Sequence, residues 1–151
     1  MITNKRGITP IMATLLLVSF AVAVGVVVMN FGRAQVEEEA QCAINIGLKL
    51  AEIGGQQQLC YDSTQQSIRF TIENGVNIKV EGLIVNIIET DKAESIEVNE
   101  AKIIKAGTYL GTIKHAASSI QQVKIIPKVM LFDQEEICAE QALVVENIRN
   151  C

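Results

Sequence analysis

The chain has 151 residues, of which 49% are hydrophobic, 4% are aromatic and none is Trp. Its formal net charge is −4, and because Lys5 and Arg6 precede Gly32 while all 17 acidic residues follow it, the later part carries about −6 (11 basic against 17 acidic). Nucleic-acid binding needs clustered Lys and Arg, so this balance argues against nucleic acid as a partner.

The N-terminal segment is the most apolar part of the chain. Residues 8–32 carry no charge, and as a helix this stretch would rise roughly 37 Å, more than the ~30 Å hydrocarbon core of a bilayer. Lys5 and Arg6 lie before it, and three consecutive glutamates, residues 37–39, lie after it. This basic-residue bias predicts a cytoplasmic N-terminus and an external C-terminal domain.

Two general interpretations of this segment compete with a more specific one. A cleaved secretory signal could use the small residues around Arg33, but the apolar core is longer than the roughly 7 to 15 residues typical of such signals. A plain signal anchor explains the hydropathy, but it leaves the residues that flank the segment unexplained.

Those flanking residues are Lys5, Arg6 and Gly7, directly before Ile8 and the apolar run that contains Pro10. In this respect the chain resembles the archaeal type IV pilins and archaellins. The resemblance implies a leader, residues 1–7, that a prepilin peptidase removes by cutting between Gly7 and Ile8. A glycine suits a tight protease cleft, and Pro10 would fall in the first helical turn, where its missing N–H costs nothing; a simple helix start explains Pro10 equally well.

One position departs from the wider family. Bacterial type IV pilins carry a Glu as the fifth mature residue, whereas Met12 stands here; archaeal members commonly lack that Glu. Assembly would then depend on packing between apolar helix faces, which small residues from Ala13 to Gly25 would let approach closely. The residues expected to form the assembly helix are Pro10, Leu15, Leu16, Leu17, Phe20, Val24, Val27 and Phe31.

The resemblance implies a structural role. We expect a pilin-like precursor that sits in the membrane, is processed, and then polymerises into a cell-surface filament with a possible adhesion role. Its implied partners are identical or related pilin subunits, the prepilin peptidase and the membrane. The alternative is an uncleaved, membrane-anchored extracellular binding module. Neither role is enzymatic, and neither needs a cofactor or a metal.

The rest of the chain has the texture of a β domain. Residues 8–41 are expected to form the helix and a spacer, and residues 42–151 an extracellular domain in which Ile68, Phe70 and Ile72 alternate with polar residues. Strands are expected within residues 42–53, 59–73, 78–88, 95–99, 102–105, 109–114, 123–131 and 142–145, with a turn at 54–55. Gly82 suggests a bulge, and Pro127 suggests an edge strand. The expected fold is therefore α+β, with a long hydrophobic helix followed by an immunoglobulin-like β-sandwich.

All four cysteines, Cys42, Cys60, Cys138 and Cys151, follow the apolar segment, and an even number there favours two disulfides. Adjacent parallel first and last strands would pair Cys42 with Cys138 and Cys60 with Cys151, whereas a turn after Cys138 would allow sequence-adjacent pairs. The sequence leaves the pairing open. No Cys-x-x-Cys motif is present, and a zinc site is disfavoured.

His115 is the single histidine of the chain. No second His and no nucleophile pattern accompanies it, and the carboxylates are spread singly, so we expect a surface or turn residue and no catalytic group. Phosphate-binding glycine motifs and N-glycosylation sequons are also absent from the sequence.

Overall fold

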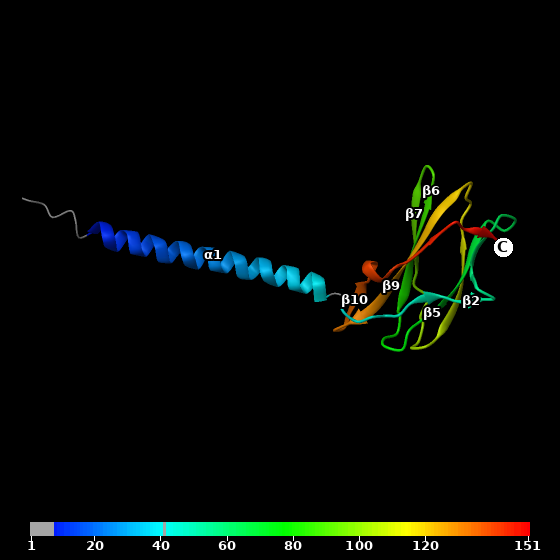
Figure 1. Cartoon of the computed structure of the whole chain (residues 1–151), viewed down its shortest axis with the longest axis horizontal. Helices are drawn as coiled ribbons and strands as arrows, with labels where there is room; N and C mark the ends of the chain where they lie inside the picture. The colour runs from blue at the N-terminus through cyan, green and yellow to red at the C-terminus, as the bar shows by residue number, and fades with distance from the viewer. Residues whose placement is uncertain (1–7, 41) are drawn as a thin grey trace, which may run out of the picture. The chain divides into compact units, whose positions relative to one another are not determined.

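The computed structural model describes residues 8–40 and 42–151, with the side chains of residues 9–33 and 42–151. The chain divides into two units: one contains a single long helix, α1 (Ile8–Ala40), and the other is a β domain from Cys42 to Cys151 (Figure 1). The expected α+β composition, with an apolar helix preceding a β domain, is confirmed.

One sheet of the β domain is built around β5. Its strands are β1 (Lys49–Leu50), β4 (Leu59–Asp62), β5 (Ser67–Glu73), β8 (Thr108–Lys114) and β12 (Arg149–Asn150). β8 pairs with the whole of β5, and β1 and β4 pair with successive parts of it, while β12 runs parallel to β4. A separate hairpin, β2 (Glu52–Ile53) and β3 (Gln56–Gln57), turns at the two predicted glycines, which have φ of 62° and 76°.

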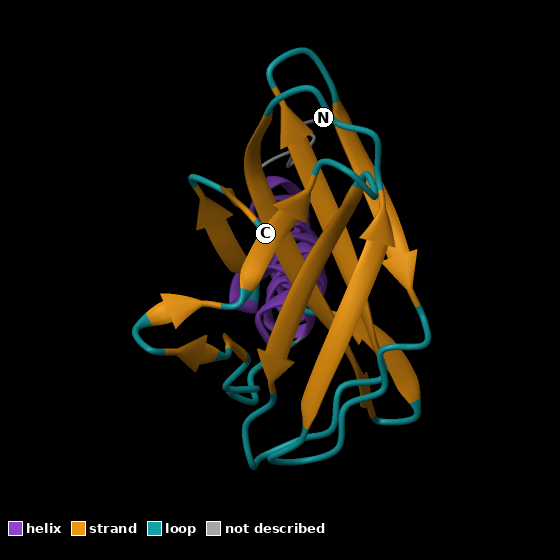
Figure 2. Cartoon of the chain, turned by 90° about the vertical axis from the view of Figure 1, so that its right-hand side faces the viewer, coloured by secondary structure: helices purple, strands orange, loops and turns teal. Residues whose placement is uncertain are grey.

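The second sheet is built around β9. Its strands are β6 (Gly82–Glu89), β7 (Ala93–Val98), β9 (Ile120–Leu131), β10 (Gln134–Ile137) and β11 (Leu143–Glu146). β6 lies between β7 and β9, and β10 and β11 pair with successive parts of β9, separated by the short 3-10 helix η1 (Ala139–Gln141). Figure 2 shows the strands of the two layers running along the domain.

Period-two alternation in both sheets creates the core. Ile68 and Ile72 of β5 and Val85 and Ile87 of β6 are completely buried, whereas residues that alternate with them, such as Arg69 and Asn86, are more exposed. The buried cluster draws on both sheets, so the domain is a two-layer β-sandwich with one apolar interior.

Several strand predictions need correction. Residues 42–48 form no strand; the side chain of Gln141 bonds their backbone instead. Residues 59–73 hold two strands, because the Asp62 carboxylate accepts the backbone N–H groups of Thr64 and Gln65, each at 3.0 Å, and stabilises a tight turn. Residues 102–105 contribute only an isolated bridge between Ile103 and Val80.

The predictions for Gly82 and Pro127 are also wrong. The register shift of β6 lies between Ile88 and Glu89, and Gly82 instead leaves room for the side chain of Lys128, since a Cβ there would lie 2.9 Å from Lys128 Cε. Pro127 lies in a strand that is paired on both sides, at the break between β11 and β10 where no ladder donor is needed; its carbonyl accepts the N–H of Cys138 at 2.9 Å.

Candidate functional site

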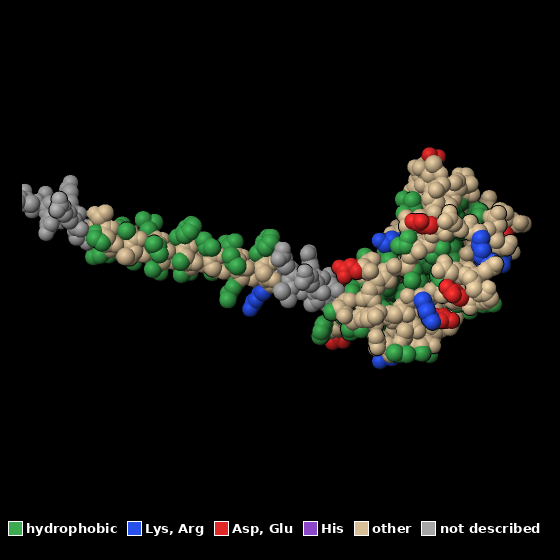
Figure 3. Space-filling view, in the orientation of Figure 1, with side chains coloured by type: hydrophobic (Ala, Val, Ile, Leu, Met, Phe, Trp, Pro, Cys, Tyr) green, Lys and Arg blue, Asp and Glu red, His purple; other side chains and the backbone are tan. Residues whose placement is uncertain are grey.

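The apolar helix α1 is the most unusual surface of the chain. Every side chain from residue 9 to residue 33 is exposed, and the apolar ones surround the helix rather than forming one stripe (Figure 3). Among the predicted assembly residues, Leu16 is 69% exposed, and Leu17 and Phe20 are each 71% exposed. A helix that is apolar on all sides needs lipid or other apolar helices around it.

The length and internal bonding of α1 suit a membrane. Residues Thr9–Arg33 form a 25-residue segment long and apolar enough to cross a bilayer, a property that anchors and signal sequences share. Two of its hydroxyls bond within the helix: Thr14 Oγ1 donates to the carbonyl of Ile11 and Ser19 Oγ to that of Leu15, each at 2.8 Å. These two hydroxyls therefore add little polar cost in an apolar environment.

The predicted processing residues fall at the border of what the structure describes. Lys5, Arg6 and Gly7 lie outside the described residues, and Ile8 is the first residue of α1. Pro10 lies in the first turn of α1, where the backbone N–H that it lacks would have no helical partner. The leader and the proposed cut thus remain predictions.

The four cysteines form two disulfides, Cys42–Cys138 and Cys60–Cys151, with Cα atoms 5.5 Å and 5.0 Å apart. This is the pairing expected from adjacent parallel first and last strands, although only the second bond joins a parallel pair, β4 and β12. The bonds fasten the first residue of the β domain and its last. Disulfides of this kind are typical of domains outside the reducing cytosol.

Gln141 reinforces the first bond from inside the fold. Its Oε1 accepts the N–H of Ile46 at 2.7 Å, and its Nε2 donates to the carbonyls of Cys42 at 2.8 Å and Ile44 at 2.7 Å. One amide side chain thus replaces the strand pairing that residues 42–48 lack.

His115 is buried, so the expectation of a surface residue is wrong, although it does follow the end of β8. Its Nε2 lies 2.6 Å from Glu89 Oε1 of β6, and its Nδ1 lies 2.9 Å from Glu94 Oε2 of β7. The hydrogen bond from His115 holds the pKa of Glu89 below its ordinary value, against the opposite effect of burial. The cluster ties the segment after β8 to the other sheet.

A second buried charge lies on the outer side of β9. Lys128 is 2% exposed, and its Nζ bonds Glu97, Asn99 Oδ1 at 2.5 Å and Glu135 Oε1 at 3.0 Å. The bond to Glu97 raises the pKa of Lys128 and lowers that of Glu97. In β9, Lys128 alternates with the buried core residues Val123, Ile125 and Val129, but no sequence signal showed that strand pairing would surround it with acceptors.

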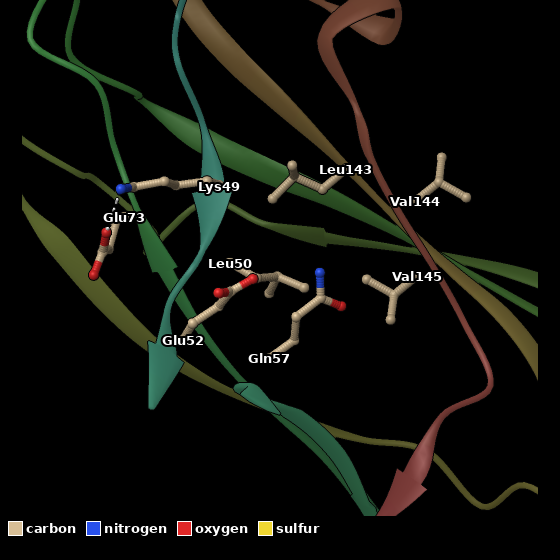
Figure 4. A pocket seen from close by; sticks show the side chains of 8 residues that line it. All are labelled: Lys49, Leu50, Glu52, Gln57, Glu73, Leu143, Val144 and Val145. Atoms are coloured by element: carbon tan, nitrogen blue, oxygen red, sulfur yellow. Dashed lines mark ion pairs between the residues drawn. The ribbon is translucent and has the colours of Figure 1, made fainter. Parts of the chain in front are cut away.

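An open groove of about 510 Å³ lies between β1, β3 and β11. Figure 4 shows the ion pair of Lys49 with Glu73 directed away from Leu143 and Val145 on the opposite wall. The polar groups do not converge on one point, which a catalytic centre would require. Within residues 9–33 and 42–151, no three His, Cys, Asp or Glu side chains gather in a way that could hold a metal ion.

No protein-family model, curated protein or solved structure matches the chain. The functional reading therefore depends on the residues and the geometry described above.

Proposed function

We propose that the chain is the precursor of a structural subunit of an archaeal type IV pilus-like surface filament. The observation that carries this proposal is the uncharged helix segment of residues 8–32, apolar on all sides, that directly follows Lys5, Arg6 and Gly7. In the precursor the helix would lie in the bilayer, and in the filament it would pack among the helices of identical or related subunits.

The proposed topology has the N-terminus in the cytoplasm and the β domain outside, as the basic residues before α1 favour. The two disulfides support an external β domain, because such bonds persist in oxidising surroundings. An immunoglobulin-like arrangement of the two sheets belongs to the same proposal. The role is mechanical and adhesive and not enzymatic.

Cleavage by the peptidase tests this proposal. The full chain would be produced in membranes with an archaeal prepilin peptidase, and its N-terminus would be determined by mass spectrometry. We expect loss of residues 1–7 from the unmodified chain and no cleavage of Gly7→Val, because a branched side chain would block the cleft. Reversing the charges of Lys5 and Arg6 should also abolish cleavage.

Gly32→Val is the matched control, since a Cβ at Gly32 meets nothing within 4 Å. This variant should be cut like the unmodified chain. An unmodified chain that keeps residues 1–7 in the presence of active peptidase would contradict the proposal. It would favour the alternative, a membrane-anchored β-sandwich binding module.

A further inference from the structure

At one end of the β domain lie its first segment, residues 42–48, and three of the connections between its strands. Strand registers pair Lys49 with Glu73 and Glu73 with Thr108 in one sheet, and Gly82 with Lys128 in the other. We call this the entry end; it comprises residues 42–48, the loops 74–81 and 99–107, and the β9–β10 hairpin of residues 128–137.

Direct contacts hold these segments together. Asn77 Nδ2 donates to the carbonyl of Asn45 at 2.7 Å, and Asn74 Nδ2 donates to the carbonyl of Ile104 at 3.1 Å. Gly75 lies against residues 46–47 so closely that a Cβ would fall 2.2 Å from the carbonyl oxygen of Ile46. The entry end is therefore an ordered surface.

Exposed apolar side chains concentrate at this end. The β domain exposes nine large hydrophobic residues, and six of them belong to the entry end: Ile44, Val76, Ile104, Met130, Phe132 and Ile137. None of the nine lies in the turns 63–66 and 90–92 or in residues 115–119, at the opposite end. Figure 3 shows apolar side chains projecting along the lower margin of the domain. Such an uneven distribution marks an interaction surface.

Phe132 is the most exposed of the six. Its side chain is 97% exposed, and its backbone has φ of 49°, with Asp133 following at 60°. Tight hairpin turns with two positive φ values favour Asn and Gly, so an aromatic residue here brings strain and no packing within the domain. Phe, with Trp and Leu, is also among the side chains that interfacial segments insert into the headgroup layer.

Charge at the entry end differs from that of the rest of the domain. Its segments hold four lysines, Lys79, Lys102, Lys105 and Lys128, and five acidic residues, Glu81, Glu100, Asp133, Glu135 and Glu136. The 10 basic and 14 acidic residues from 42 to 151 give the domain −4, of which the entry end carries −1 and the remainder −3. A nearly neutral surface with apolar side chains and flexible lysines suits a bilayer interface better than the acidic remainder.

A short tether connects this end to the apolar helix. Eight residues separate Arg33, the last residue of the candidate span, from Cys42; the first seven continue α1, and even a fully extended chain of this length would reach no further than roughly 32 Å. The Cys42–Cys138 bond fixes the tether to β10, which starts at the Phe132 turn. A bilayer that holds α1 would therefore lie within reach of the entry end.

We propose that the entry end docks on the surface of the bilayer that α1 crosses, with Phe132 and Ile104 entering the headgroup layer. The occupant is the lipid surface. This inference requires α1 to span a membrane, but it does not require cleavage after Gly7 or assembly into a filament. The two proposals can thus fail separately.

Tryptophan fluorescence tests the docking directly, because the chain contains no Trp. The full chain carrying Phe132→Trp would be placed in phosphatidylcholine nanodiscs, one chain per disc, with or without bromine on the acyl chains. We expect loss of emission in the brominated discs. Thr64→Trp, in the turn between β4 and β5 at the opposite end, is the control and should emit equally in both discs.

A third variant separates docking from a local effect at the reporter. Adding Ile104→Glu to Phe132→Trp should reduce the quenching, and since Ile104 is 73% exposed the fold should be retained. Equal emission of Phe132→Trp in both kinds of disc would overturn the proposal. So would a blue shift that grows with the number of chains per disc without bromine quenching, because it would identify a second copy as the occupant.

Discussion

Phe132 stands in a backbone conformation that aromatic residues rarely adopt. We predict that Phe132→Asn stabilises the β domain by about 1 kcal/mol, because Asn tolerates positive φ and the 97% exposed ring makes no packing contribution that would be lost. Thermal unfolding of the full chain in detergent would measure the change. A lower melting temperature for this variant would show that the ring stabilises the fold itself and is not held for an external contact.

The pair of Glu89 and His115 predicts a pH dependence. Because the pKa of Glu89 is lowered in the folded state, its stabilising contribution is present above the ordinary value of 4.5 and is lost as the pH falls through the folded pKa. We predict that His115→Ala raises the pKa of Glu89, so that this variant is less stable than the unmodified chain near neutral pH but loses less further stability as the pH falls below 4.5. NMR titration of the Glu89 carboxyl group, together with melting temperatures across the same pH range, would measure both effects.

Lys92→Ala is the matched comparison, since Lys92 Nζ lies 3.4 Å from Glu89 and contributes less than His115 to lowering its pKa. Its titration should shift less than that of His115→Ala. An unchanged Glu89 titration in His115→Ala would contradict the role given to the histidine.

The sequence predicted the environments of His115 and Lys128 only in part. The sequence predicted strands within residues 109–114 and 123–131, and His115 directly follows the first of them and Lys128 lies in the second. Several acceptors of these side chains lie far away in sequence: Glu89 is 26 residues from His115, and Glu97 is 31 residues from Lys128. Register between distant strands decides such contacts, and local pattern carries no information about it.

At the scale of elements, the Cys42–Cys138 disulfide holds a segment that no strand pairing stabilises. Residues 42–48 have no strand partner and depend on the Cys42–Cys138 bond and the amide of Gln141. We predict that replacing Cys42 and Cys138 by Ser lowers the unfolding free energy by about 2 to 4 kcal/mol and accelerates hydrogen exchange in residues 42–48. Exchange followed by mass spectrometry would locate the effect.

The second disulfide supplies the control, because it closes a loop of similar length, 91 residues against 96. Replacing Cys60 and Cys151 by Ser should cost comparable stability and leave exchange in residues 42–48 unchanged. Equal acceleration of that segment in both variants would mean that it follows global unfolding and not the local bond.

The elements predicted from sequence were those with strong alternation or clear turn residues. The strands around Ile68 and Val123 and the Gly54 turn are confirmed, as is the apolar helix. The strand prediction for residues 42–53 was wrong in its first part. The β-branched residues there suggested a strand, whereas the side chain of Gln141 forms the hydrogen bonds with the backbone of residues 42–48. The edge-strand prediction for Pro127 was wrong because a central strand also tolerates a proline at a break between two partner strands, where no N–H donor is needed.

At the scale of the whole molecule, the sequence alone predicted one apolar helix followed by a disulfide-bonded β domain, and the structure has both. Lipid and other apolar helices would cover the exposed surface of α1 equally well. The assembled state therefore depends on the partners of the chain and not on its fold alone. The proposed filament and the proposed membrane docking of the entry end describe successive environments of the same subunit.

Intact mass and N-terminal sequencing of the protein recovered from its own cell surface test the central claim most directly. We predict a chain that begins at Ile8 and sediments with filaments, since removal of residues 1–7 would precede packing of the apolar helix. A chain that retains Lys5, Arg6 and Gly7 and stays in the membrane fraction would contradict the filament-subunit proposal and leave a membrane-anchored β-sandwich domain.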